Sequence, residues 1–124
     1  MLANRCLMAL FVTAVAGIAL PAAAQDAADV EQLQAAAGAY VGCLRATVQM
    51  GMTTKMDPAV FKEGFAKSCM PQEAAFRTAA IKAFVAQGRT ETEAAAEVDG
   101  NIANGRQIFA QDQETYIKTG KVPR

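Results

Sequence analysis

Two cysteines, Cys43 and Cys69, follow the apolar N-terminal segment of this chain, and a third, Cys6, lies within that segment. A bond between the first two would close a loop of about 26 residues and stabilise the fold by roughly 3.5 kcal/mol. Redox-active dithiols usually have the much narrower C-x-x-C spacing. We therefore expect a structural Cys43–Cys69 disulfide, provided that the chain reaches an oxidising compartment.

The N-terminus has the pattern of a signal peptide. Arg5 precedes an uncharged apolar run, Cys6–Leu20, and Ala22 and Ala24 supply the small side chains that signal peptidase needs before the cut. An uncleaved membrane anchor is the alternative, but a run of about 15 residues is shorter than the ~20 that a spanning helix needs. Residues 1–24 are thus predicted to be removed, leaving a periplasmic or secreted protein.

The charge balance excludes some classes of function. The chain has 12 acidic and 12 basic residues, and removing residues 1–24 takes away Arg5 alone, so the mature chain has a slight acidic excess. Nucleic-acid-binding proteins normally carry a clear positive excess, so no nucleic-acid partner is expected. No later segment is apolar enough to suggest a membrane span.

The stretch from Asp29 to about Met52 has the periodicity of an amphipathic helix. Its larger apolar residues recur at steps of three, four and seven: Val30, Leu33, Tyr40, Val41, Leu44 and Val48. Gly38 and Gly42 lie one turn apart, beside Ala35, Ala39 and Ala46. A strip of such small residues lets a neighbouring helix approach closely, and we expect it to pack within the molecule.

Asp57 and Pro58 mark the start of a second helix, because Asp is a favoured N-cap and Pro is favoured at the first helical position. This helix is expected over residues 58–69, with Phe61, Phe65 and Cys69 at successive fourth positions. Pro71 then ends it or begins the next helix.

A third helix is expected from Pro71 to Gln87, with Gly88 as its C-terminal stop. Its predicted buried face carries Phe76, Ala80, Ile81, Phe84 and Val85.

Thr90 and Glu93 form a capping-box pattern that predicts a fourth helix. Its apolar face reads Val98, Ile102, Gly105, Phe109, Asp112 and Tyr116, and Asp112 is the one charged residue in that series. Gly100 and Gly105 leave open a kink or break, and Asn104-Gly105 leaves open a β-hairpin. Residues 119–124 are predicted to be a flexible tail.

The predicted fold is an all-α bundle of three to four helices, forming one domain over residues 25–118. Cys43 lies about nine residues before the end of the first helix, and Cys69 lies about eleven after the start of the second. With a rise of 1.5 Å per residue, their heights along two antiparallel helices would differ by only a few ångströms. The two would therefore meet if these helices formed an antiparallel hairpin, with the disulfide joining its arms and the other helices folding onto it.

The residue types present argue against an enzyme. The chain contains no histidine, which excludes Ser–His–Asp and Cys–His nucleophilic systems, histidine-bound zinc and c-type haem attachment. Ser68 has no nucleophile elbow around it, and glycine-rich phosphate loops are absent. No cofactor is expected.

Two clusters could still bind a metal. Met50, Met52 and Met56 carry soft thioether sulfurs that suit Cu(I), although methionines also fill irregular gaps around a helical connector. Copper would need at least three converging sulfurs. The acidic group Glu91, Glu93, Glu97 and Asp99 could bind a divalent cation, but acidic residues also complement a helix N-terminus.

By elimination, the chain is expected to be a non-enzymatic interaction module whose partner is an unidentified protein or envelope component. The alternative is a carrier of a small apolar ligand, in a cavity lined by Phe61, Phe65, Phe76, Phe84 and Phe109. The same phenylalanines would also be expected in the core of a helical bundle, because the chain has only six phenylalanines.

Overall fold

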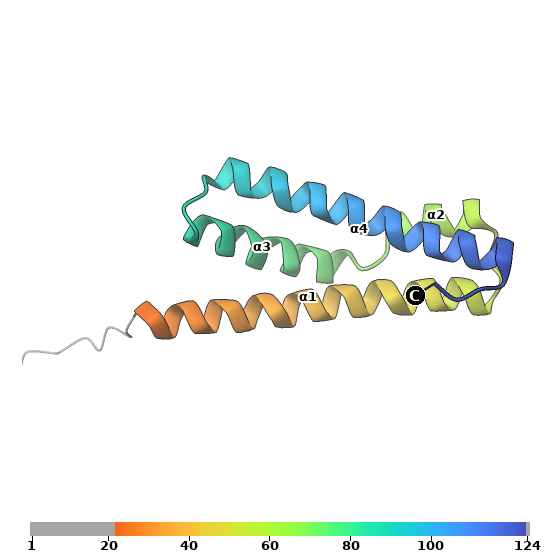
Figure 1. The fold of residues 1–124 in the computed structure, drawn as a ribbon, viewed down its shortest axis with the longest axis horizontal. Coiled ribbons are helices and arrows are strands. Elements are labelled where there is room, and N and C mark those ends of the chain that lie inside the picture. Colours follow the sequence, from red (N-terminus) through yellow and green to blue (C-terminus); the bar gives the residue numbers. More distant parts are fainter. Residues whose placement is uncertain (1–21, 124) are drawn as a thin grey trace, which may run out of the picture.

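The computed structural model describes residues 22–123, and all regular structure in that range is helical. Four helices follow one another, α1 (Ala22–Thr53), α2 (Pro58–Ala66), α3 (Met70–Ala86) and α4 (Glu91–Thr119) (Figure 1). The predicted all-α fold is therefore confirmed for this range. Most of the predicted signal peptide lies outside the described residues, and the expected cut between Ala24 and Gln25 falls close to the beginning of α1.

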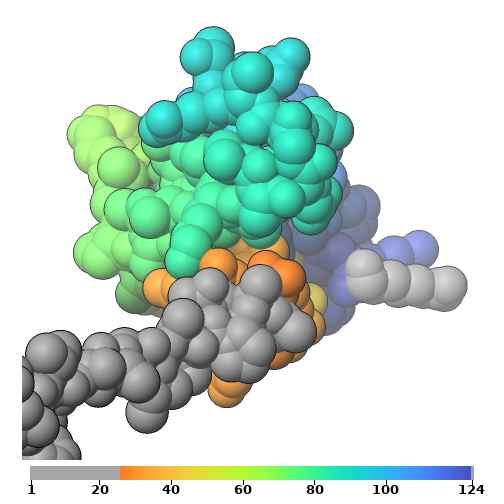
Figure 2. All heavy atoms as spheres, turned by 90° about the vertical axis from the view of Figure 1, so that its left-hand side faces the viewer, coloured from red at the N-terminus to blue at the C-terminus, as the bar shows by residue number. Residues whose placement is uncertain are grey.

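The helices form three rods: α1, α4, and a broken rod that consists of α2 followed by α3. α1 and α4 are long and run in the same direction, while α2 and α3 follow each other along the bundle in the opposite direction (Figure 1). Lys82 Nζ lies 2.7 Å from Asp29 Oδ1, and the rings of Tyr40 and Phe76 stack at 5.6 Å, which fixes the antiparallel register of α1 and α3. Seen from the end, the beginning of α1 lies beneath α3 and α4 (Figure 2).

The Cys43–Cys69 disulfide is present, with the two Cα atoms 5.9 Å apart. The expected position of Cys69 is wrong, because α2 ends at Ala66 and Cys69 is the N-cap of α3, with φ of 60°. A helix continuing through this region would need an N–H from Pro71 for the Lys67 carbonyl, and the proline ring would clash with that carbonyl. The disulfide therefore joins α1 to the start of α3, not to α2.

The core is built from apolar residues of every helix and from Cys69. Its buried members are Tyr40, Leu44, Val48, Phe61, Phe65, Cys69, Ala80, Val98 and Ile102. Two residues expected there are exposed, Val30 by 53% and Val85 by 43%. At 3.6 residues per turn, Val30 lies about 80° around α1 from Tyr40, and Val85 about 180° around α3 from Phe76.

The strip of small residues on α1 does not pack within the described part of the molecule, so that expectation is wrong. Gly38 and Gly42 are exposed, and a methyl group on either would have nothing within 4 Å among the described residues. The larger side chains of α1 determine its buried face, since they remove more apolar area from water. Close approach occurs instead at Gly51, where a Cβ would lie 2.6 Å from Phe61 Cδ2.

Local capping signals set the other helix ends as predicted. Asp57 Oδ1 accepts from the backbone N–H groups of Ala59 and Val60 at the start of α2, and Thr90 and Glu93 form the capping box of α4. α4 runs without interruption through Gly100 and Gly105, so neither the break nor the β-hairpin forms.

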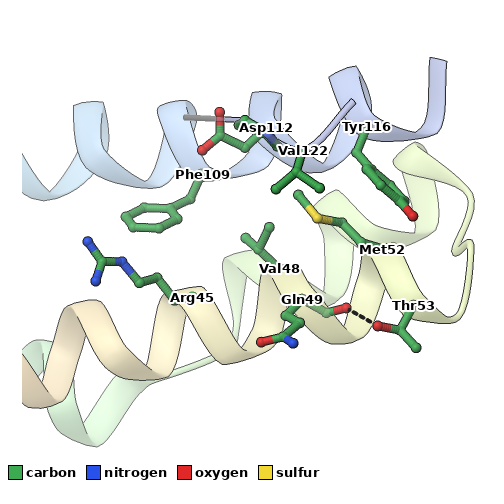
Figure 3. Close-up of a pocket in the computed structure, with 10 residues that line it drawn as sticks. Arg45, Val48, Gln49, Met52, Thr53, Phe109, Asp112, Tyr116 and Val122 are labelled. Atoms are coloured by element: carbon green, nitrogen blue, oxygen red, sulfur yellow. Dashed lines mark hydrogen bonds between the residues drawn. The ribbon is translucent and has the colours of Figure 1, made fainter. Parts of the chain in front are cut away.

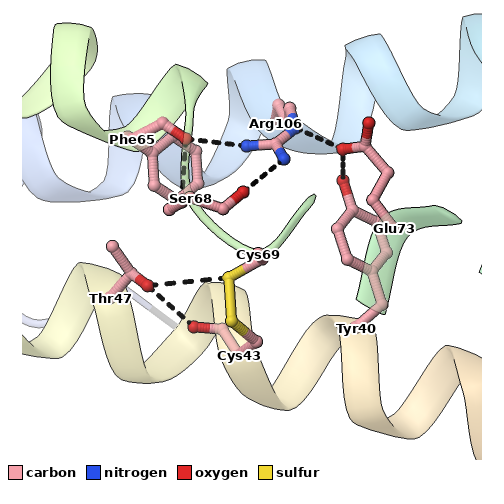
Figure 4. The surroundings of a disulfide bond; sticks show 8 residues. All are labelled: Tyr40, Cys43, Thr47, Phe65, Ser68, Cys69, Glu73 and Arg106. Carbon is pink, nitrogen blue, oxygen red and sulfur yellow. Dashed lines mark hydrogen bonds and ion pairs between the residues drawn. A yellow bond between two sulfur atoms is a disulfide. The ribbon is translucent and has the colours of Figure 1, made fainter. Parts of the chain in front are cut away.

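Arg106 of α4 holds the junction between α2 and α3 (Figure 4). Its guanidinium donates to the carbonyl oxygens of Phe65 and Ser68, both at 2.7 Å, and to Glu73 Oε2 at 2.6 Å. The Phe65 carbonyl also accepts from the backbone N–H and the hydroxyl of Ser68, at 3.1 and 2.8 Å, in the turn that ends α2. The arginine thus binds the broken rod to α4.

Two contacts tie α2 and the segment just before it to α4. Lys62 Nζ lies 2.8 Å from Glu114 Oε2, and the buried Gln113 donates from Nε2 to the Met56 carbonyl at 2.8 Å. Hydrogen bonds from Lys118 and Lys62 lower the pKa of Glu114 to about 2. None of the helices in residues 22–123 has the length and apolar character needed to cross a bilayer.

Candidate functional site

A groove of about 680 Å³ lies between the C-terminal halves of α1 and α4. We call it the α1–α4 groove (Figure 3). It is lined from α1 by Arg45, Val48, Gln49, Met52 and Thr53, from α4 by Phe109, Asp112 and Tyr116, and from the segment after α4 by Val122 and Pro123. Its volume falls within the range of about 300–1,000 Å³ that is usual for small-molecule sites.

Helical spacing brings these side chains together. The lining residues of α1 and α4 recur at steps of three and four, so each helix presents one face to the groove. The chain then turns back after α4 because Gly120, with φ of 68°, adopts the left-handed conformation. This turn places Val122 and Pro123 at the edge of the groove, where Val122 remains 72% exposed.

The groove combines an apolar floor with charged walls. Val48 is buried, and Met52 and Phe109 pack against the core. Arg45 and Asp112 also line the groove, from opposite helices, and the Phe109 ring lies between their charged groups in the view of Figure 3. A hollow with an apolar surface and a few polar groups can bind a ligand and orient it.

Asp112 is the residue that interrupts the apolar face of α4 in the sequence, and the structure places it in the groove, half-buried. Sequence reasoning did not single out Arg45, because a helical arginine usually belongs to a solvated surface. The available signal was its position next to Leu44 in the apolar stripe of α1.

The three methionines considered for copper do not line the same hollow. Met50, which is 58% exposed, and Met56 line a small cavity of about 120 Å³ beside Phe61, whereas Met52 lines the α1–α4 groove. From the sequence, copper binding is an alternative only, and the positions of these sulfurs do not favour it.

Three of the four acidic residues considered for a cation have other partners. Glu93 is part of the capping box, Glu97 pairs with Arg89, and Asp99 pairs with Arg77 at 2.6 Å, whose hydrogen bond lowers the pKa of Asp99. Within residues 22–123, histidine, cysteine, aspartate and glutamate nowhere form a group of three or more suited to a metal ion.

The five phenylalanines considered for an apolar cavity lie around different hollows. Phe61 and Phe65 are buried and stack on each other at 5.1 Å. Phe76 and Phe84 line a second hollow, of about 320 Å³, between α1, α3 and α4. Phe109 lines the α1–α4 groove and shares a smaller hollow, of about 180 Å³, with Phe76.

No protein-family model matches the chain, and neither a curated protein nor a solved structure shows significant similarity to it. The geometry and chemistry of the groove are therefore the basis for a functional assignment.

Proposed function

We propose that this chain is an exported, non-enzymatic binding protein that takes a small ligand or a short segment of an envelope partner into the α1–α4 groove. The disulfide supports an oxidising location, periplasmic or extracellular, because such bonds rarely persist in the cytosol. The N-terminal pattern of Arg5 followed by the apolar run Cys6–Leu20 supports export.

The observation that carries the proposal is the α1–α4 groove with Arg45 and Asp112 in its walls. The disulfide and the hydrogen bonds of Arg106 link the helices of the bundle, so the groove is formed by helices whose relative positions are fixed. A site supported in this way can keep its shape when empty, which lowers the entropic cost of binding.

A carrier of a small apolar ligand is the second candidate. The hollow of about 320 Å³ favours it, because its lining is largely apolar, including Leu33, Phe76, Phe84 and Val98. Binding there would engage the end of the bundle that is remote from the α1–α4 groove, so the two candidates predict different contacts.

Residue-resolved NMR tests the proposal. The mature protein is titrated with the low-molecular-mass fraction of a bacterial periplasmic extract, and backbone amide shifts are followed. We expect changes concentrated between Arg45 and Thr53 and between Phe109 and Tyr116. Changes confined to the surroundings of Phe76 and Phe84 would favour the carrier, and an unchanged spectrum would contradict a small-ligand role.

A variant that fills the groove sharpens the test. Gln49 is an exposed residue that lines the groove, whereas Gln32 is an exposed glutamine of the same helix outside the described hollows. Gln49→Trp should abolish the shifts, and the matched control Gln32→Trp should leave them intact. Equal effects of the two substitutions would exclude the groove as the binding site.

A further inference from the structure

Arg45 and Asp112 differ from most comparable residues of the described chain in having no charged partner there. Arg77, Arg89 and Arg106 each pair with a carboxylate. Arg45, the remaining arginine between residues 22 and 123, forms no ion pair and no side-chain hydrogen bond with the described residues, and the same is true of Asp112.

Three of the other four aspartates in the described residues have a partner or a capping role. Asp29 and Asp99 pair with Lys82 and Arg77, and Asp57 caps α2, whereas the exposed Asp26 near the start of α1 has no such partner among the described residues. Asp112 instead lies in the middle of α4, half-buried, on a face that is otherwise apolar. Aspartate is a poor residue for a helix interior, so neither helix formation nor packing accounts for it.

The two charges restrict what can cover the groove. Arg45 is exposed and Asp112 is half-buried, so an apolar ligand in the groove would take at least the Asp112 carboxylate from water without giving it a partner, which is unfavourable. An anionic ligand would satisfy Arg45 but leave Asp112 desolvated beside a like charge, and a cationic ligand would do the reverse. A ligand with both charges and an apolar part satisfies the whole lining.

We propose that the α1–α4 groove binds a small zwitterion, namely an apolar amino acid or short peptide with free ends. This inference rests on the proposed function and specifies the ligand class of the same site. Arg45 accommodates the carboxylate, for which guanidinium geometry is well suited. Asp112 accepts from the ammonium group, and Val48, Met52 and Phe109 contact the apolar side chain.

The test uses leucine, dileucine and trileucine as probes, each as the free zwitterion, the N-acetylated form, the C-terminal amide and the doubly blocked form. Calorimetric titration of the full mature protein measures the affinities. For at least one length, we expect the free form to bind about tenfold or more tightly than either singly blocked form, because a charge-assisted hydrogen bond is lost in each case.

Two variants assign each end of the probe to its residue. In Asp112→Asn, N-acetylation should no longer weaken binding, and in Arg45→Gln, C-terminal amidation should no longer do so. Asp26→Asn is the control for Asp112→Asn, and Lys55→Gln is the control for Arg45→Gln, since each removes a charge of the same sign outside the groove. In both controls, blocking either end of the probe should weaken binding as it does in wild type.

Blocked and free probes of equal affinity would overturn the zwitterion proposal, as would the failure of all free probes to bind. The proposed function would survive either result if the periplasmic extract still shifted the groove amides in wild type and not in Gln49→Trp. If neither the free probes bound nor the extract shifted the groove amides, both the proposed function and the proposed ligand class would be wrong.

Discussion

Arg106 Nε donates to Glu73 Oε2 at 2.6 Å although the two residues are 33 positions apart in the chain. Both side chains are largely buried, being 16% and 19% exposed. The Tyr40 hydroxyl donates to the same oxygen at 2.8 Å (Figure 4). One carboxylate thus joins α1, α3 and α4 beside the disulfide.

Arg106→Met should lower the free energy of unfolding by about 3 kcal/mol, because Glu73 is left without a cation and the carbonyls of Phe65 and Ser68 each lose the hydrogen bond from the guanidinium. Urea denaturation measures the change. Arg77→Met is the control, since the Arg77–Asp99 pair is exposed and should contribute about 1 kcal/mol or less. Losses of equal size in the two variants would show that the Arg106 cluster does not hold the junction.

Tyr40 should make the protein sensitive to alkali. Burial of its hydroxyl, helped by the hydrogen bond to Glu73, raises the pKa of Tyr40 from 10.0 to about 12. Between these values the unfolded chain loses the proton and the folded one keeps it, so stability is full below pH 10 and falls as the pH rises to about 12.

Urea denaturation across this range checks the expectation. Tyr40→Phe should remove part of the alkaline decline. A decline of the same size in wild type and Tyr40→Phe would refute the role of the buried hydroxyl.

Gly51→Ala should destabilise the protein by about 1–3 kcal/mol, since the new methyl group would clash with the buried Phe61 ring. Thermal unfolding with Gly42→Ala as the matched control measures this effect. At Gly42 the methyl group meets no described atom, so helix propensity should stabilise the protein by up to about 1 kcal/mol. The same sign of change at both positions would contradict the packing described for Gly51.

The sequence-based predictions were correct where the deciding interactions join residues that are close in the sequence. Asp57 and the Thr90–Glu93 box act within one helical turn, so they predicted the starts of α2 and α4 correctly. The Cys43–Cys69 bond was predictable from the number of cysteines and from the N-terminal pattern of a signal peptide. The end of α2 was predicted wrongly, because the spacing of Phe61, Phe65 and Cys69 suggests a helix through Cys69. Pro71 prevents such a helix, since it has no N–H to donate to the Lys67 carbonyl.

The groove could be anticipated only in part. Asp112 stood out in the apolar series of α4, but nothing local indicated which helix would lie opposite. Arg45 and Asp112 line the same groove from opposite helices because the C-terminal halves of α1 and α4 lie side by side, which depends on the return of the chain through α2 and α3. The return of Val122 depends on the left-handed Gly120 and on long-range packing.

Asp112→Leu should raise the free energy of unfolding by about 1 kcal/mol, because leucine is a better helix former and continues the apolar face. The same substitution should abolish binding of the free peptide probes. Chemical denaturation and calorimetry measure the two effects. Asp99→Leu should give no such gain, since it removes the pair with Arg77. A destabilised Asp112→Leu protein would mean that Asp112 has a structural role.

Export and disulfide bonding underlie the whole proposed function. The most direct test is the intact mass of the protein recovered after expression with its own N-terminus, measured with alkylation before and after reduction. The predicted mass is that of residues 25–124 less two hydrogens, with no alkylation before reduction and two alkyl groups after it. A mass that includes residues 1–24, or alkylation of Cys43 and Cys69 without reductant, would contradict an exported, disulfide-bonded binding protein.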